Sequence, residues 1–260
     1  MTGKTLAELG LTPKSGNPRT RIDALALDSR AVKPGTLFAA LPGTRFHGAE
    51  FAAPALRMGA SALLTDRAGA KMAAETLARH PDVALVVAED AREALALAAA
   101  LFFGVQPDCM VAVTGTNGKT SVASFTRQIW QAIGHAAINI GTTGVEGSWG
   151  RALAHTTPDS VTLQELLAQA AEAGVTHAAM EASSHGLDQR RLEGVRLKAA
   201  GFTNLTQDHL DYHADMEEYF QAKAGLFTRL LPEEGVAVIN TDDPYGARLA
   251  GMVEQRVIRV

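Results

Sequence analysis

A glycine-rich segment, VAVTGTNGKTS at residues 111–121, joins an apolar run to a Gly-Lys-Thr sequence. In phosphate-binding loops, glycines let backbone N–H groups approach phosphate oxygens, the lysine neutralises charge, and the following hydroxyl coordinates Mg²⁺. The strict spacing of such loops is not met, because its first glycine would fall on Val113. The flanking strand and helix patterns still favour a nucleoside triphosphate site over a chance turn. The residues expected to bind this nucleotide are Gly115, Thr116, Asn117, Gly118, Lys119, Thr120 and Ser121.

A second segment that could support chemistry begins at Glu181, which follows the apolar run His177–Met180. Open α/β sheets bind ligands at the carboxyl ends of their strands, so a carboxylate there can hold Mg²⁺ opposite Thr120. Arg191, further along, offers a guanidinium fork that suits a carboxylate. Its neighbour Arg190 is expected to be a solvated charge.

The segment TNLTQDHLDYH, residues 203–213, is dense in oxygen and nitrogen ligands. Without thiolates it is not expected to form a closed zinc site. His213 is expected at the surface or at a helix cap. Lys223, ten residues later, lies on an amphipathic pattern whose ordinary interpretation is a surface charge on an apolar stem. Thr156 and Thr157 precede a helical stretch and leave two possibilities open, a helix N-cap or a ligand contact.

These residues need a scaffold, and the pattern predicts two α/β regions joined near Gln106-Pro107-Asp108. Short apolar strands that alternate with helices are typical of a parallel, doubly wound sheet. The expected domains are residues 1–106 and 107–260. In the first, strands are expected at Leu25–Leu27, Thr36–Leu41, Ser61–Thr65 and Val83–Ala88, and helices at Ala49–Gly59, Ala68–Arg79 and Ala91–Phe103. In the second, strands are expected at Cys109–Val113, Ala136–Ile140, His177–Met180, Ala199–Thr203, Val236–Ile239 and Arg256–Val260, and helices at Lys119–Ile133, Val161–Ala173 and Met216–Leu230.

Composition sets limits on the function. The chain has 260 residues, of which 47% are hydrophobic and 20% charged, so it is not intrinsically disordered. A net charge of −4 indicates no nucleic-acid or membrane partner. One cysteine, Cys109, rules out a disulfide framework and fits a reducing compartment. With no signal peptide and no run long enough to span a bilayer, a cytoplasmic, bacterial location is expected.

The loop TGTNGKT, residues 114–120, resembles that of the Mur ligase family, ATP-dependent enzymes of peptidoglycan synthesis. Asp28-Ser29-Arg30 and Leu37-Phe38-Ala39-Ala40 are similar to the start of that family's UDP-binding domain. Where that family usually has Asp-Gly, this chain has His47-Gly48, a mild departure from the family pattern. The resemblance implies a small UDP-muramoyl-binding domain followed by a central ATPase domain, incomplete here, with the amino-acid-selecting domain absent. It also implies substrate contacts in the first domain from Leu27, Ser29, Thr44, Arg45 and Phe46.

Within the family, the chain is most similar to the MurE type, which adds the third peptide residue. The resemblance implies that the muramoyl peptide is bound by His155, Thr156, Thr157, Ser183, Gln189 and Arg191. It implies that His209 helps to bind a second Mg²⁺, and that Lys223 is carbamylated and ligates metal. The implied catalytic residues are Lys119, Glu181, His209 and Lys223, and the implied metal ligands are Thr120, Glu181, His209 and Lys223 as its carbamate.

The implied reaction begins when ATP phosphorylates the D-glutamate carboxylate of UDP-N-acetylmuramoyl-L-alanyl-D-glutamate. An amine then displaces phosphate from the acyl phosphate. The incoming amino acid, lysine or meso-diaminopimelate, cannot be read from these residues. Another Mur ligase, a folylpolyglutamate synthetase, or a non-catalytic module that binds UDP-sugar and ATP remain alternatives. We expect a monomer that binds substrate and ATP but does not complete ligation by itself.

Overall fold

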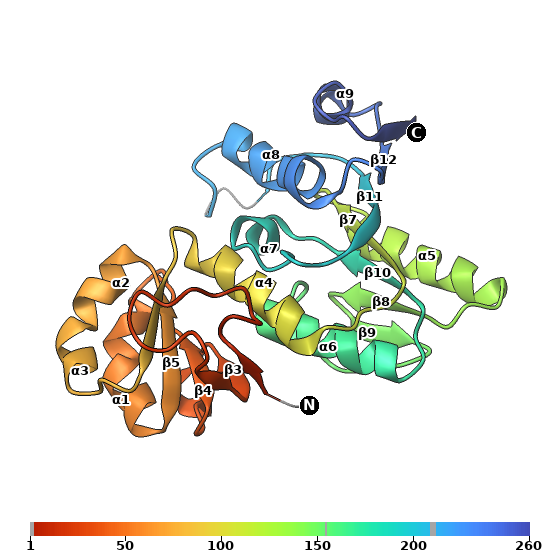
Figure 1. Cartoon of the computed structure of the whole chain (residues 1–260). Helices are drawn as coiled ribbons and strands as arrows, with labels where there is room; N and C mark the ends of the chain where they lie inside the picture. Colours follow the sequence, from red (N-terminus) through yellow and green to blue (C-terminus); the bar gives the residue numbers. More distant parts are fainter. Residues whose placement is uncertain (1–2, 154, 209–211) are drawn as a thin grey trace. The chain divides into compact units, whose positions relative to one another are not determined.

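The computed structural model describes residues 3–153, 155–208 and 212–260 of the chain (Figure 1). The chain divides into two compact units, Met1–Gly104 and Val105–Val260. Both units carry parallel sheets with helices, so the expected α/β fold class is confirmed. None of the helices in the described part of the chain is long and apolar enough to cross a membrane.

The first unit is built on a parallel sheet in the order β3-β4-β5-β6, beside an antiparallel pair, β1 and β2. Its core includes Phe38 and Leu63 from the sheet and Leu56 from a helix. The strands are β1 (Lys4–Thr5), β2 (Arg21–Ile22), β3 (Ala24–Ala26), β4 (Thr36–Ala39), β5 (Ala60–Thr65) and β6 (Ala84–Val87). The helices are α1 (Ala52–Arg57), α2 (Arg67–Met72), α3 (Ala74–Ala78) and α4 (Ala91–Phe103), with short 3-10 turns η1 (Ser29–Ala31) and η2 (Gly48–Phe51).

Two helices of this unit differ from the expectation. The stretch Ala68–Arg79 is two short helices, α2 and α3, that meet at Ala73. The stretch Ala49–Gly59 begins as η2 and continues as α1. By contrast, the structure has α4 at the expected bounds, because Asp90 caps its first turn and Gly104 ends it with a positive φ of 81°.

The second unit contains a seven-stranded sheet in the order β13-β12-β11-β7-β10-β8-β9, parallel except for β9. The strands are β7 (Cys109–Thr114), β8 (Ala137–Gly141), β9 (Gly144–Gly147), β10 (His177–Glu181), β11 (Leu197–Phe202), β12 (Val236–Ile239) and β13 (Arg256–Arg259). The helices are α5 (Lys119–Ala132), α6 (Ser160–Glu172), α7 (Ser184–Asp188), α8 (Met216–Gly225) and α9 (Pro244–Ala250), and a π-helical segment, η3 (Leu226–Leu230), continues α8.

Alternate residues of the central strands pack on opposite faces of this sheet. Met110 of β7 and Met180 of β10 join a large core with α6, α8 and α9, whereas Val113 and Ala179 pack with Ala123 of α5. The register pairs Glu181 with Val113, so the carboxyl ends of β10 and β7 lie together. The phosphate-loop sequence and Glu181 therefore leave the sheet at the same edge, where open α/β folds bind ligands.

Candidate functional site

A pocket of about 450 Å³ opens at this edge of the second unit. Residues from four separate segments surround it: the glycine-rich loop, the turn after β8, the stretch before α6, and the stretch from the end of β10 to just past α7. Its lining consists of Thr116, Asn117, Gly118, Lys119, Thr120, Thr142, His155, Thr156, Thr157, Glu181, Ser183, His185 and Arg191. We call it the phosphate-loop pocket. Most of the residues expected to bind ATP or peptide in this unit lie in it; Ser121 on α5, Gln189, and Gly115 are not among its lining residues.

The glycine-rich loop has the backbone that its sequence requires. Gly115 and Gly118 have φ values of 144° and 88°, a region that side chains disfavour. A Cβ on Gly115 would lie 1.9 Å from Thr203 Oγ1. Gly118 is the N-cap residue of α5 and has no side chain to cap the helix. The first N–H groups of α5 therefore receive no side-chain cap from it, and together with the positive end of the helix dipole they favour an anion.

The segment after β11 holds the loop in place. Thr203 Oγ1 donates to the Asn117 carbonyl at 2.6 Å, and the Asn117 N–H donates to Asn204 Oδ1 at 3.0 Å. Thr116 is fixed twice, since its N–H donates to the Asn204 carbonyl at 2.8 Å and its hydroxyl exchanges hydrogen bonds with the backbone of Thr206. The segment at residues 203–213, which is dense in oxygen and nitrogen groups, thus supports the phosphate loop through hydrogen bonds of Thr203, Asn204 and Thr206. His209 and Asp211 lie outside the described residues.

Two lysines converge on one loop carbonyl. Lys119 Nζ donates to the carbonyls of Gly115 and Thr116 at 2.8 and 2.9 Å, and Lys223 Nζ donates to Gly115 at 2.9 Å. Burial lowers the pKa of Lys119, an effect opposed by the carboxylates of Glu181 and Asp208. Burial, followed by the charge of Lys119, lowers the pKa of Lys223 to about 7, while Asp208 acts in the opposite direction.

The ordinary interpretation of the helical pattern, a surface charge at Lys223, is therefore wrong. Its side chain is 1% exposed, and its Nζ lies 4.5 Å from the ring centroid of Tyr219. Tyr219 is itself fully buried, with its hydroxyl 3.3 Å from Thr116 Oγ1. Tyr219 and Lys223 of α8 therefore lie against the phosphate loop, a contact that the helical pattern alone does not reveal.

Glu181 is held in one orientation at the end of β10. It is 2% exposed, and its Oε1 accepts from the Thr142 N–H at 2.9 Å while its Oε2 accepts from the Thr142 hydroxyl at 3.3 Å. A Cβ on Gly141 would lie 1.9 Å from Glu181 Oε1, so a glycine is needed for this approach. Glu181 and Thr120 both line the pocket, and their oxygens are of the kind that Mg²⁺ prefers.

Four of the six residues expected to bind the peptide, Thr157, Ser183, Gln189 and Arg191, form one network. Thr157 donates to the Glu181 carbonyl at 3.1 Å and accepts from the N–H and the hydroxyl of Ser183, both at 3.1 Å. Arg191 Nη1 donates to the Thr157 carbonyl at 2.6 Å, and its Nη2 donates to Gln189 Oε1 at 2.7 Å. Gln189 therefore orients the guanidinium of Arg191 instead of lining the pocket.

The N-cap alternative for the threonine pair is wrong, because Asp159 caps α6 and accepts from Val161 and Thr162. Thr156 Oγ1 lies 3.0 Å from Thr142 Oγ1 at the pocket. The expectation of a surface or capping role for His213 is also wrong, since it is 1% exposed. Arg190 is not simply solvated either, because it forms an ion pair with Glu193 at 3.3 Å.

Sequence reasoning missed two lining residues, Thr142 and His185. Thr142 directly follows the carboxyl end of β8, and ligand sites of open α/β sheets lie at such ends, so its position could have indicated a role in the site. His185 stands two residues after Ser183, and its ring packs against that of Tyr212 with centroids 4.0 Å apart and a tilt of 39°. Within the described ranges, no group of three His, Cys, Asp or Glu side chains is arranged to hold a metal ion.

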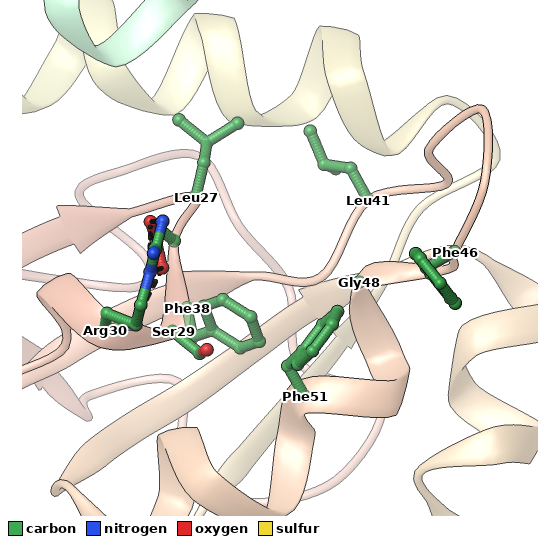
Figure 2. A pocket seen from close by; sticks show the side chains of 9 residues that line it. Leu27, Ser29, Arg30, Phe38, Leu41, Phe46, Gly48 and Phe51 are labelled. Atoms are coloured by element: carbon green, nitrogen blue, oxygen red, sulfur yellow. Dashed lines mark hydrogen bonds and ion pairs between the residues drawn. The ribbon is translucent and has the colours of Figure 1, made fainter.

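The first unit has its own pocket, of about 600 Å³. Figure 2 shows the side chains of Leu27, Leu41, Phe38, Phe46 and Phe51 around it. Ser29 and Gly48 also line it, together with Asp28 and Arg30, which pair at 2.6 Å. We call it the aromatic pocket. Phe46 and Phe51 are 62% and 44% exposed, so their rings are open to a ligand. Of the expected contacts, Leu27, Ser29 and Phe46 line this pocket, whereas Thr44 and Arg45 do not.

His47, the departure from the family pattern, supports the loop beside the aromatic pocket. Its Nδ1 accepts from the Ala49 N–H at 3.0 Å and caps η2, so Nε2 is the nitrogen that donates to Asp66 Oδ1 at 3.1 Å. Asp66 in turn caps α2 by accepting from Gly69 N–H at 2.7 Å. Histidine thus supplies the capping acceptor that an aspartate would give, and it joins two helix starts.

Comparison with known proteins agrees with this geometry. Residues 113–260 match the Mur ligase middle domain, and residues 21–103 match the model described as Mur ligase family, catalytic domain. The chain is 52% identical over 244 residues to the UDP-N-acetylmuramoyl-L-alanyl-D-glutamate–2,6-diaminopimelate ligase of Mesorhizobium japonicum, a match that covers 92% of this chain and 48% of the relative. For the enzyme of the same name from Brucella melitensis, the identity is 53% over 228 residues, covering 87% and 45%.

A solved structure of a ligase with this name superposes with a TM-score of 0.81 at 30% identity, covering all of this chain and 52% of that one. The chain spans about half the length of the curated relatives it matches. Because the family model for the middle domain matches more than half of the chain, the chain belongs to the Mur ligase family.

Proposed function

We propose that this chain carries the nucleotide- and substrate-binding part of a UDP-N-acetylmuramoyl-L-alanyl-D-glutamate–2,6-diaminopimelate ligase. The aromatic pocket of the first unit takes the uracil and diphosphate end of the UDP-linked substrate. The phosphate-loop pocket of the second unit takes ATP and the peptide. The names of the relatives support 2,6-diaminopimelate as the incoming amino acid. The domain boundary near residue 106 and the monomeric, cytoplasmic state are part of this proposal.

One observation carries the proposal: a single pocket joins the phosphate loop to the buried Glu181 and to Arg191. A carboxylate is a poor electrophile, and phosphorylation by ATP turns it into an acyl phosphate with a good leaving group. Lys119 Nζ already lies at the loop, where it donates to two backbone carbonyls. When ATP binds, it would exchange these carbonyls for phosphate oxygens and neutralise their charge. Arg191 would hold a carboxylate of the peptide in line with the nucleotide.

The residues present fit Mg²⁺. Glu181 presents a buried carboxylate to the same pocket as the Thr120 hydroxyl, and both are hard oxygen donors. When bound, Mg²⁺ would supply charge neutralisation between the phosphates and the reacting carboxylate. His209, which we also propose as a metal ligand, lies outside the described residues.

The environment of Lys223 supports its carbamylation. The neutral amine attacks CO₂, a C–N bond forms, and the amine loses a proton to give an anionic carbamate. A pKa of about 7 leaves much of the Lys223 amine neutral at neutral pH, so the reactive form is available. The carbamate would place an oxygen ligand beside the phosphate loop, where Lys223 already contacts Gly115.

Isothermal titration calorimetry tests the function. The chain is expected to bind UDP-N-acetylmuramoyl-L-alanyl-D-glutamate and not dihydrofolate, and to bind ATP more tightly with Mg²⁺ than without it. Preference for the folate would contradict the proposal and favour a folylpolyglutamate synthetase. A coupled assay of ADP release with the dipeptide substrate and 2,6-diaminopimelate then asks whether these residues alone turn over; we expect that they do not.

A further inference from the structure

The end of helix α7 has an unusual backbone. Arg190 is the one non-glycine residue with a positive φ, 56°, in the part of the chain that the structure describes. This left-handed conformation is strained for a residue with a Cβ and is normally left to glycine. An arginine at this position therefore needs compensation from its surroundings.

The strained residue belongs to a Schellman turn. The Arg190 N–H donates to the Leu187 carbonyl at 3.2 Å, and the Arg191 N–H donates to the Gly186 carbonyl at 2.9 Å. These are the two bonds that define this helix ending, with Arg190 in the position that glycine usually takes. The turn fixes the direction in which Arg191 leaves the helix.

The side chain of Arg190 is anchored behind the turn. Its Nη1 lies 3.3 Å from Glu193 Oε1, and the same oxygen is 2.7 Å from Nε of Arg229. The Glu193 side chain is only 6% exposed, and Arg229 also donates to the Leu187 carbonyl at 2.9 Å. A buried carboxylate between two guanidinium groups depends on both partners, because removal of either leaves charge less compensated.

Arg191 enters a different network. Its guanidinium reaches the Thr157 carbonyl and Gln189 Oε1 at the phosphate-loop pocket. One turn thus sends consecutive arginines to two separate places, one to a buried ion-pair cluster and the other to the candidate peptide site.

We propose that Arg190 is a positioning residue, whose anchorage to Glu193 holds the left-handed turn that aims Arg191 at the acidic peptide of the substrate. This inference rests on the proposed function, because the peptide is the group that Arg191 would bind. Arg190 acts through the turn and makes no contact with the substrate itself.

The test compares three variants by calorimetry with UDP-N-acetylmuramoyl-L-alanyl-D-glutamate and, separately, with Mg·ATP. Arg190→Ala keeps a Cβ in the strained position without the anchor, and Glu193→Gln removes the anchoring charge. Both are expected to weaken substrate binding about tenfold and Mg·ATP binding less than about twofold. Arg190→Gly, which adopts the turn without strain, is expected to recover most of the substrate affinity.

Equal losses for Arg190→Gly and Arg190→Ala would overturn the proposal, because they would indicate direct contact with the substrate. A parallel loss of Mg·ATP binding would also overturn it, since a general loss of structure would then explain both. The Arg191 Nε–H resonance gives a readout that needs no substrate: it should shift in Arg190→Ala and return in Arg190→Gly. A parent chain that binds Mg·ATP but not the UDP-linked dipeptide would contradict the proposed function, while the Nε–H resonance would still decide whether Arg190 positions Arg191.

Discussion

Lys119 and Lys223 share one acceptor: their Nζ atoms donate to the Gly115 carbonyl at 2.8 and 2.9 Å. The two lysines come from α5 and α8, which are far apart in the sequence. Burial is the main cause of the lowered pKa of Lys223, and the charge of the neighbouring Lys119 ammonium lowers that pKa further. The phosphate loop therefore links the charge state of the two side chains.

Removing the charge of Lys119 should raise the pKa of Lys223. In Lys119→Met, the charge that disfavours protonation of Lys223 is gone, whereas its burial remains. The pKa can be followed through the Lys223 Cε and Nζ resonances during a pH titration. Lys198→Met, which changes an exposed lysine on β11, is the matched control and should leave the pKa unchanged. An unchanged pKa of Lys223 in Lys119→Met would show that the charge of Lys119 does not affect Lys223.

The buried Lys223 should make stability depend on pH. Its folded pKa, about 7, lies below its ordinary value of 10.5, so the unfolded chain binds more protons between these values. The penalty of burying the ammonium is fully present below about pH 7, and wild-type stability should rise relative to Lys223→Met as pH increases from about 7 to about 10.5. The slope has an upper limit of about 1.4 kcal/mol per pH unit.

Trp130 and Trp149 both lie in the second unit, so tryptophan fluorescence during urea unfolding follows the unit that contains Lys223. A stability difference between wild type and Lys223→Met that is flat over this range would show that the folded pKa is not lowered.

Gly141 should be required for metal-dependent nucleotide binding. In Gly141→Ala, the new Cβ would meet Glu181 Oε1 at 1.9 Å and would turn the carboxylate away from its bonds with Thr142. Loss of such orienting contacts typically costs about tenfold or more in metal affinity, so Mg·ATP binding should weaken by that order. ATP binding without Mg²⁺ should change little.

The control is Gly201→Ala on β11 of the same sheet, where the added Cβ would lie at an ordinary 3.4 Å from Val113. If both alanine variants lose Mg·ATP affinity equally, the effect belongs to the sheet rather than to the orientation of Glu181.

The aromatic pocket should bind the uracil end of the substrate. Phe46 and Phe51 are exposed there, and stacking of a base on an aromatic ring is worth about 1–3 kcal/mol, so Phe46→Ala and Phe51→Ala should each weaken UDP binding about tenfold. Calorimetry with UDP measures this. Phe125→Ala, which changes a ring that is 60% exposed on α5, should bind UDP as wild type does. Full UDP affinity in both pocket variants would place the nucleotide elsewhere.

Local patterns were enough to predict most of the scaffold. Helix α4 begins after Asp90 and ends before Gly104, as expected. The apolar runs that form β7 and β10 place the phosphate loop and Glu181 at one edge of the sheet. Short polar elements were not predicted. The antiparallel strand β9 has two glycines in four residues, and α7 is only five residues long, so neither has a period to detect.

The environment of individual charges could not be predicted either. Lys223, Arg190 and His213 carry polar groups that sequence patterns assign to the surface by default. Each lies among residues that are distant in the sequence or that take an unusual backbone, such as Tyr219 packed with Thr116 of the loop, or the positive φ of Arg190. Such contacts depend on how α7 and α8 pack, which no local pattern encodes.

In the proposed function, the UDP end of the dipeptide substrate binds in the aromatic pocket and its peptide end binds in the phosphate-loop pocket. Titration of the labelled protein with UDP-N-acetylmuramoyl-L-alanyl-D-glutamate, followed by chemical-shift changes, tests it most directly. We expect saturable shifts at Ser29, Phe46 and Phe51 in the first unit and at Thr157, Ser183 and Arg191 in the second. UDP alone should reproduce only the first set. No shifts in either set, or shifts from the dipeptide substrate confined to residues outside both pockets, would contradict the proposed function.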